Sequence, residues 1–272
     1  MIKHALLSAS SAHRWLNCTP SARLTEHIED TQSVYAAEGN LAHDLAELEL
    51  KFQLKLITKN TYNKELKKIK ANELYSEEMP DEVEKYTDFV FERLTEAQSH
   101  TADALIFLEQ RLDFSKWVPE GFGTGDCIII ADGTMEVIDF KYGKGVEVYA
   151  ENNPQMMLYA LGALDEYGFI YDIEKVRMTI AQPRIDNFST WEIAVEELES
   201  WAETELREKA QAAWEGKGEC IAGDWCKFCK VKATCKARAE AMLAIAESYQ
   251  QRDPHLLTIE EIAVILHKAE EI

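Results

Sequence analysis

Two apolar runs joined by Asp132-Gly133 constrain the fold of this chain of 272 residues more than any other feature. An Asp-Gly pair between such runs is a strong signal for a β-hairpin with a two-residue turn. In that hairpin Ile128 faces Val137, and Asp126 faces Asp139. Facing Cβ atoms lie about 4.5–5.5 Å apart, and like charges in that position are destabilising. The hairpin therefore needs a positive charge or a cation beside its two aspartates.

A lysine accompanies the facing carboxylates. Lys141 follows Asp139 by two residues, so strand alternation places it on the same face as both aspartates. Two carboxylates suit a hard cation such as Mg²⁺ or Mn²⁺, which polarises a phosphodiester and lowers the pKa of a bound water. The lysine can orient that water or stabilise developing negative charge. A salt-bridged surface hairpin would explain Asp139 and Lys141 alone, but the facing Asp126 favours a metal site.

Helical patterns precede the hairpin and a third strand pattern leads into it. Apolar residues at three-to-four spacing predict a helix through Leu41, Leu45 and Leu48, and a second helix from Asp81 onward. A strand is expected over residues 104–112. We expect the helices to pack on the core that the strands form.

The pattern after the hairpin predicts a helix, two strands and a further helix. Asn153 is a helix N-cap candidate with Pro154 at the first helical position. Strand-like runs follow at 175–182 and 188–195, and an acidic helix is expected from about Glu196 to Trp214. In the first of these helices Gln155 and Tyr159 stand four residues apart and share one face. The whole order predicts an α/β fold with a mixed sheet.

Charge and hydropathy restrict the partners. A net charge of −20 argues against diffuse attraction to DNA, because phosphate contacts come from Lys and Arg. Residues 1–25 and 225–239 nevertheless carry several basic residues and no acid, and both contain cysteines. No stretch approaches the roughly 20 apolar residues of a membrane span, so we expect a cytoplasmic protein that makes no membrane contact.

The cysteines suggest a second metal site. In a reducing compartment thiols are more commonly metal ligands than disulfides. Cys226, Cys229 and Cys235 lie in one short segment, at a spacing that suits a metal ion or an iron–sulfur cluster. Cys18 and Cys220 are the candidates for a fourth ligand, whereas Cys127 is expected to be a small buried residue of a strand. Local spacing alone favours structural zinc.

Three motifs together resemble one enzyme family. They are Gly123-Thr124-Gly125-Asp126, Ile138-Asp139-Phe140-Lys141 and Gln155 to Tyr159, in that order. They resemble the G-x-x-D, (D/E)-x-K and Q-x-x-x-Y motifs of the RecB-like branch of the PD-(D/E)xK nucleases. The resemblance implies a restriction-endonuclease-like core with a mixed central sheet and flanking helices. It also implies that Asp126, Asp139 and the Phe140 backbone carbonyl bind metal, that Lys141 is catalytic, and that Gln155 and Tyr159 contact substrate.

The same resemblance extends to residues outside the hairpin. Gly39 to His43 is similar to the family's G-x-x-x-H pattern, which implies His43 as a further metal ligand, and Glu109 is an additional candidate. An imidazole ligand favours Mn²⁺ over Mg²⁺. Relatives of the AddB type and the CRISPR-associated exonucleases carry one cysteine before the core and three after it. By that likeness Cys18 joins the segment 226–235 in holding a [4Fe–4S] cluster, with zinc as the alternative.

We expect four regions from the sequence pattern, and the resemblance implies a function. The regions expected are a helical part over 1–103, a nuclease core over 104–215, a cysteine segment over 216–238, and C-terminal helices over 239–272 that continue in a longer natural chain. The expected function is a Mg²⁺- or Mn²⁺-dependent deoxyribonuclease, an exonuclease acting on single-stranded DNA ends in phage or bacterial replication, recombination or repair.

Two other functions fit parts of the sequence. A non-catalytic DNA-binding or assembly module would keep the fold and the cysteines without turnover, and a zinc-stapled interaction domain would explain the acidic surface. A dinucleotide site at residues 121–126 is rejected because the third glycine of the motif is missing and a strand follows. The chain contains no G-x₄-G-K-[ST] motif, so a helicase, like a single-strand-binding protein, would be a separate partner.

Overall fold

A computed structural model describes residues 5–29, 33–250 and 258–263. It divides into two compact units, one of residues 1–12 with 30–208 and one of residues 13–29 with 209–272. Lys3 and the parts of the expected C-terminal helices at 251–257 and 264–272 lie outside the described residues. Among the helices that the structure describes, none is long and apolar enough to cross a membrane.

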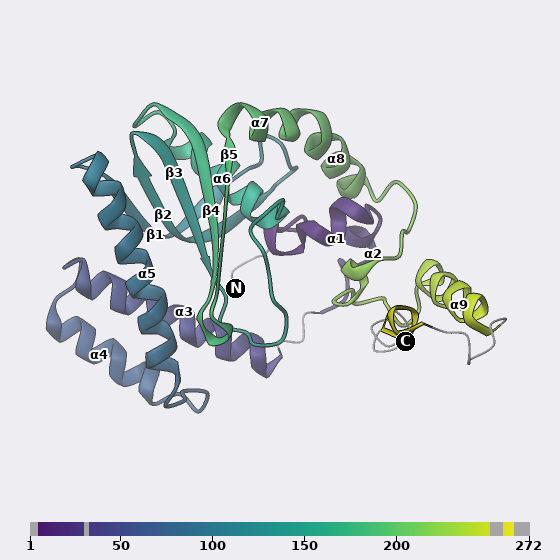
Figure 1. Cartoon of the computed structure of the whole chain (residues 1–272), viewed down its shortest axis with the longest axis horizontal. Coiled ribbons are helices and arrows are strands. Elements are labelled where there is room, and N and C mark those ends of the chain that lie inside the picture. The colour runs from purple at the N-terminus through teal and green to yellow at the C-terminus, as the bar shows by residue number, and fades with distance from the viewer. Residues whose placement is uncertain (1–4, 30–32, 251–257, 264–272) are drawn as a thin grey trace. The chain divides into compact units, whose positions relative to one another are not determined.

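The first unit is built on a five-stranded mixed sheet in the order β1-β2-β3-β4-β5 (Figure 1). The strands are β1 (Leu105–Asp113), β2 (Phe122–Ala131), β3 (Gly133–Phe140), β4 (Ile173–Gln182) and β5 (Asn187–Ala194). Neighbours are antiparallel except β3 and β4, which are parallel. A parallel pair needs a crossover connection, and helix α6 (Pro154–Tyr167) supplies it. The predicted α/β architecture with a mixed sheet is confirmed.

The hairpin forms in the register that its turn predicts. Ile128 pairs with Val137, and Ile130 pairs with Met135. Gly133 follows Asp132 in the turn with a φ of +76°, a left-handed conformation that glycine adopts without a steric penalty. The last ladder pair is Cys127 with Ile138, so the strands separate where the two aspartates begin.

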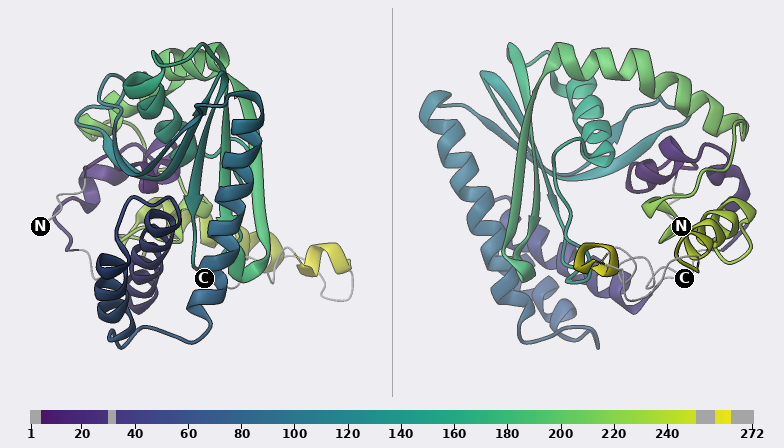
Figure 2. Two further views of the ribbon diagram at one scale, coloured as in Figure 1. Left: turned by 90° about the vertical axis from the view of Figure 1, so that its left-hand side faces the viewer. Right: turned by 45° about the vertical axis from the view of Figure 1, so that its right-hand side comes forward.

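Helices cover both faces of the sheet. Helices α3 (Val34–Gln53), α4 (Lys59–Lys70) and α5 (Met79–His100) share a buried core with Cys127, Ile129, Ile138 and Phe140 on one face. Helix α6 lies on the other face, as the right-hand view of Figure 2 shows. Strand β3 is therefore covered on both sides, and its residues from Met135 to Phe140 are all buried.

Caps explain where two of these helices begin. The Ser33 hydroxyl accepts a hydrogen bond from the Ala36 N–H at the start of α3. The Asn153 side chain accepts from the N–H groups of Gln155 and Met156 at the start of α6, as predicted. This cap orients the first turn of α6, which carries Gln155.

The second unit is formed by two segments far apart in the sequence. Its elements are α1 (Ala12–Asn17), α2 (Ser21–Thr25), the end of α8 (Arg207–Glu215), η4 (Asp224–Cys226) and α9 (Lys236–Gln250). Helix α8 continues α7 (Val195–Trp201) and η3 (Ala202–Leu206), so the acidic helix expected near 196–214 is present. Arg23 donates to the Trp214 carbonyl (2.6 Å), and Thr19 donates to the Lys217 carbonyl (2.6 Å). These bonds hold the N-terminal segment against the cysteine segment.

Candidate metal centre and cysteine site

Three ligand side chains converge beside the hairpin. His43 comes from α3, Glu109 from β1 and Asp126 from β2, and one ligand atom of each lies within 4.8 Å of the other two. His43 Nδ1 is 3.3 Å from Asp126 Oδ1. An imidazole and two carboxylates form a ligand set that Mn²⁺ or Mg²⁺ can use. All three residues were candidates from the sequence.

Glu109 reaches this cluster through an unusual backbone conformation. Its φ is +49°, in the left-handed region that non-glycine residues rarely adopt. The flanking pairs, Leu108 with Cys127 and Gln110 with Gly125, place Glu109 opposite Asp126, but these two residues form no ladder pair. Such conformations cost on the order of 1–3 kcal/mol and cluster at functional sites.

Asp139 and Lys141 form a second group at the end of β3. Lys141 Nζ lies 2.8 Å from Asp139 Oδ2, and Gln155 donates from Nε2 to Asp139 Oδ1 (2.9 Å). Lys141 also donates to Gln155 Oε1 (3.3 Å). The Gln155 amide is 3.4 Å from the Tyr159 hydroxyl. The structure thus brings together Asp139, Lys141, Gln155 and Tyr159 as one hydrogen-bonded group.

The Phe140 backbone connects the two groups. Its N–H donates to Asp126 Oδ2 at 2.7 Å. In a strand the N–H and C=O of one residue face the same neighbour. The Phe140 carbonyl therefore faces β2 beyond the last ladder pair, on the side where Asp126 lies. That direction suits the ligand role predicted for this carbonyl.

The electrostatics of the cluster reflect crowded carboxylates. Burial opposes the charge on His43, but Asp126 and then Asp139 and Glu109 outweigh it and raise the pKa of His43 to about 9. Burial and the charge of Asp126 raise the pKa of Glu109 to about 7. Burial also raises the pKa of Asp139, although Lys141 opposes this shift. Additional positive charge would stabilise these carboxylates.

Tyr159 is buried and packs closely against Gly123. Its side chain is only 7% exposed, so most of the ring is covered by the protein. A Cβ added at Gly123 would come within 2.6 Å of the Tyr159 ring. The G-x-x-D glycine is therefore required for close packing of Tyr159. Gly39, in contrast, has nothing within 4 Å of an added Cβ.

Five cysteines gather in the second unit. Cys18, Cys220, Cys226, Cys229 and Cys235 line one cavity of about 20 Å³. Cys127 is fully buried in the sheet of the first unit, as expected. Although all five lining cysteines belong to the described residues, no three of their sulfurs lie within 4.8 Å of one another. In a tetrahedral zinc site with Zn–S bonds of about 2.3 Å, neighbouring sulfurs are only about 3.8 Å apart.

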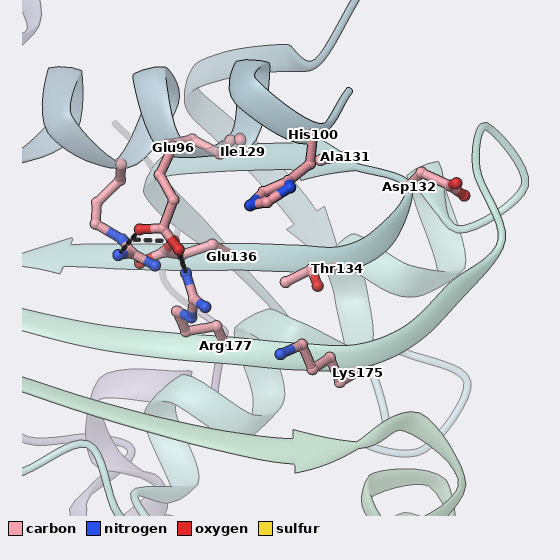
Figure 3. A pocket seen from close by; sticks show the side chains of 11 residues that line it. Glu96, His100, Ile129, Ala131, Asp132, Thr134, Glu136, Lys175 and Arg177 are labelled. Atoms are coloured by element: carbon pink, nitrogen blue, oxygen red, sulfur yellow. Dashed lines mark hydrogen bonds and ion pairs between the residues drawn. The ribbon is translucent and has the colours of Figure 1, made fainter. Parts of the chain in front are cut away.

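A larger cavity of about 320 Å³ lies on the α5 side of the sheet (Figure 3). Glu136 in its wall is 4% exposed and pairs with Arg93 of α5 (3.0 Å) and Arg177 of β4 (3.4 Å). The Thr179 hydroxyl donates to the same carboxylate (3.0 Å). Burial raises the pKa of Glu136 to about 7, with Arg93 opposing the shift. Lys175 and Arg177 in its wall also pair with Glu192, which does not line the cavity, and the cavity contains none of the candidate metal ligands.

The fold and the site define a mixed α/β protein with a candidate acidic metal centre. The chain belongs to the family described as "Protein of unknown function (DUF2800)", whose model matches residues 4–272. Among solved structures, "Crystal structure of SSO0001" matches 84% of this chain and 96% of its own, at 14% identity and a TM-score of 0.26. A TM-score this low does not establish a shared fold.

Proposed function

We propose that this protein is a metal-dependent deoxyribonuclease of the RecB-like PD-(D/E)xK type. The observation that supports it best is the convergence of His43, Glu109 and Asp126 beside the Asp139–Lys141 pair at the open end of one hairpin. These ligands suit Mg²⁺ or Mn²⁺, and the imidazole favours Mn²⁺. When bound, such an ion would polarise the phosphodiester and lower the pKa of a water ligand.

The remaining roles belong to residues of the chain. Lys141 stays protonated because Asp139 outweighs the effect of burial and raises the pKa of its ammonium group. It would orient the attacking water or stabilise charge that develops on the phosphate. Gln155 hydrogen-bonds both Asp139 and Lys141, so it would hold their relative orientation. Tyr159 would support Gln155 from the protein interior.

We further propose that the substrate is a single-stranded DNA end. The net charge of −20 leaves few cations to wrap a duplex, so contacts would follow a narrow path. The resemblance points to end-dependent cutting in phage or bacterial replication, recombination or repair, beside a separate helicase or single-strand-binding protein.

For the cysteine site we propose a [4Fe–4S] cluster held by Cys18, Cys226, Cys229 and Cys235. The sulfur spacing favours it, because a cluster spreads its thiolates over separate irons, whereas zinc draws them together. The small cavity would suit zinc better. Rotation of one cysteine side chain about its Cα–Cβ bond changes both the sulfur spacing and the cavity volume, so we prefer the cluster because the family resemblance implies it.

The decisive experiment compares linear single-stranded, linear duplex and circular single-stranded DNA, each with Mg²⁺, Mn²⁺ or chelator. We expect degradation of linear single strands with metal and survival of circles. Asp139→Asn and Lys141→Ala should each lower the rate by at least roughly 10²-fold. Asp132→Asn, in the turn of the same hairpin, is the matched control and should cut at the wild-type rate.

The alternatives predict other outcomes. Tight DNA binding without cleavage by any metal form would favour the non-catalytic assembly module. Stoichiometric zinc without DNA binding would favour the interaction domain. Equal attack on circles would make the protein an endonuclease.

A further inference from the structure

The segment between Lys141 and α6 exposes apolar side chains beside the candidate site. Residues 146–150, which we call the strap, include Val146 (40% exposed) and Tyr149 (58% exposed). Exposed apolar residues on a loop are common when they stand alone. This loop differs because its backbone is tied down at several points.

Side chains from the ends of β4 and β5 hold the strap backbone. The Gln182 side chain, which is 2% exposed, accepts a hydrogen bond through its amide oxygen and donates one through its amide nitrogen. Asn187 and Ser189 add further bonds. The bonds are Val148 N–H to Gln182 Oε1 (2.7 Å), Gln182 Nε2 to the Val146 carbonyl (2.9 Å), Asn187 Nδ2 to the Val148 carbonyl (2.9 Å) and Ala150 N–H to Ser189 Oγ (2.9 Å). The strap is therefore ordered before any ligand binds, which reduces the entropy that binding must lose.

The strap lies on the same sheet face as the catalytic candidates. Phe140 pairs with Ala181, and the Lys141 N–H donates to the Ala181 carbonyl (2.8 Å). Side chains alternate along both strands, so Gln182 points to the face that Lys141 and Asp139 share. Neighbouring strands are about 4.8 Å apart. Gln182 is thus one strand away from Lys141 on this face, and the strap backbone lies over Gln182.

We propose that Tyr149 is a stacking platform for an unpaired nucleobase of the strand that enters this site. The proposal rests on the nuclease function proposed above. Glu147 and Glu151 flank Tyr149 in the sequence and would repel phosphates, so the strand would contact the strap through its uncharged base, with its phosphates directed away from the strap. A paired base in a duplex is stacked on its neighbours, so an aromatic platform selects a single strand.

Tyr149 is more accessible to a base than Tyr159 is. The Tyr159 ring is buried at the site, whereas more than half of Tyr149 is accessible. The Tyr149 carbonyl accepts a hydrogen bond from Asn153, the residue that caps α6. The platform is thus coupled through a fixed backbone to the helix that carries Gln155.

The test uses Tyr149→Ala and Tyr149→Phe, with Phe169→Ala as matched control. Phe169 is also an exposed aromatic (84%), but it follows the other end of the 14-residue helix α6, roughly 21 Å along the axis. Affinity for a short oligothymidylate is measured by fluorescence anisotropy with Ca²⁺ in place of Mg²⁺. A second oligonucleotide carries 2-aminopurine, whose emission is quenched when it stacks.

We expect Tyr149→Ala to weaken binding by about 5- to 150-fold, the range for loss of one base–aromatic stack, and to abolish quenching. Tyr149→Phe should retain both signals, and Phe169→Ala should match wild type. All three should unfold at the wild-type temperature, because each changed ring is exposed. Wild-type binding and quenching in Tyr149→Ala would overturn the platform while leaving cleavage by the wild-type protein intact. Failure of the wild-type protein to bind or cut single strands would overturn the proposed function itself.

Discussion

Glu109 combines backbone strain with a carboxylate at the metal centre. Its left-handed φ of +49° is a conformation that glycine adopts freely, so Glu109→Gly should remove strain of about 1 kcal/mol or more. The same change removes a ligand of the cluster with His43 and Asp126. We expect a higher unfolding temperature in chelator and weaker Mn²⁺ binding by calorimetry. A variant that lost stability and kept full Mn²⁺ affinity would show that Glu109 is structural.

The pKa of Glu109 gives a second prediction. Burial and Asp126 raise this pKa from its ordinary 4.5 to about 7, so the folded protein holds the proton more tightly than the unfolded chain does. Ionisation of Glu109 therefore lowers the free energy of unfolding as pH rises from about 4.5 to about 7. Glu109→Gln removes this effect. Its advantage in unfolding temperature over wild type, measured in chelator, should grow between pH 5 and pH 8. A constant difference across this range would mean that Glu109 ionises normally.

The sequence predicts the hairpin of the site in part and the other residues less well. The Asp-Gly turn defines the register of β2 and β3 as far as Cys127 and Ile138, but the ladder ends there, so the expected facing pair of Asp126 and Asp139 is not formed. No short turn joins β1 to β2, so the placement of Glu109 opposite Asp126 could not be derived from the sequence. The burial of Tyr159 depends on its contact with Gly123, a tertiary contact that helical spacing does not contain.

At the scale of elements, α5 is attached to the sheet by a charged contact as well as by its apolar face. An apolar stripe of Val83, Tyr86 and Val90 is buried against the sheet core. Arg93, one turn further on, pairs with Glu136 of β3. Strand β3 is buried on both faces, so its sequence does not alternate between apolar and polar residues. For that reason the sequence pattern did not reveal the buried role of Glu136.

Removal of Arg93 should therefore destabilise the protein in a pH-dependent way. In Arg93→Met the buried Glu136 carboxylate loses one partner, a change that typically costs about 3–5 kcal/mol while the acid is charged. The pKa of Glu136 is about 7 in the folded protein, and loss of Arg93 would raise it further, so the acid is neutral at pH 5. Chemical denaturation should show a large loss of stability at pH 8 and a smaller one at pH 5. Lys116→Met, which removes a surface pair with Asp165, should change little at either pH. An equal loss at both pH values would contradict a charged Glu136.

At the scale of the whole molecule, two segments that are far apart in the sequence fold into one unit. Residues 13–29 belong to one compact unit with 209–272, and Cys18 shares a cavity with cysteines more than 200 positions away. Periodicity and local spacing cannot predict such a contact, because they contain no long-range information. Spacing left both Cys18 and Cys220 as candidates, the family resemblance pointed to Cys18, and the structure brings both to the same cavity.

The choice between Cys18 and Cys220 gives the last prediction. Protein purified without oxygen should be brown, with iron and acid-labile sulfide in equal amounts, if four thiolates hold a [4Fe–4S] cluster. Cys18→Ser and Cys226→Ser should each bleach the protein and lower its unfolding temperature, since the cluster would tie residues 13–29 to the cysteine segment. Cys220→Ser should keep its colour and its iron. Because Cys220 lines the same cavity, its substitution is a control matched in residue type and location. Loss of iron in Cys220→Ser with retention in Cys18→Ser would exchange their roles, and stoichiometric zinc without iron would establish the structural zinc site instead.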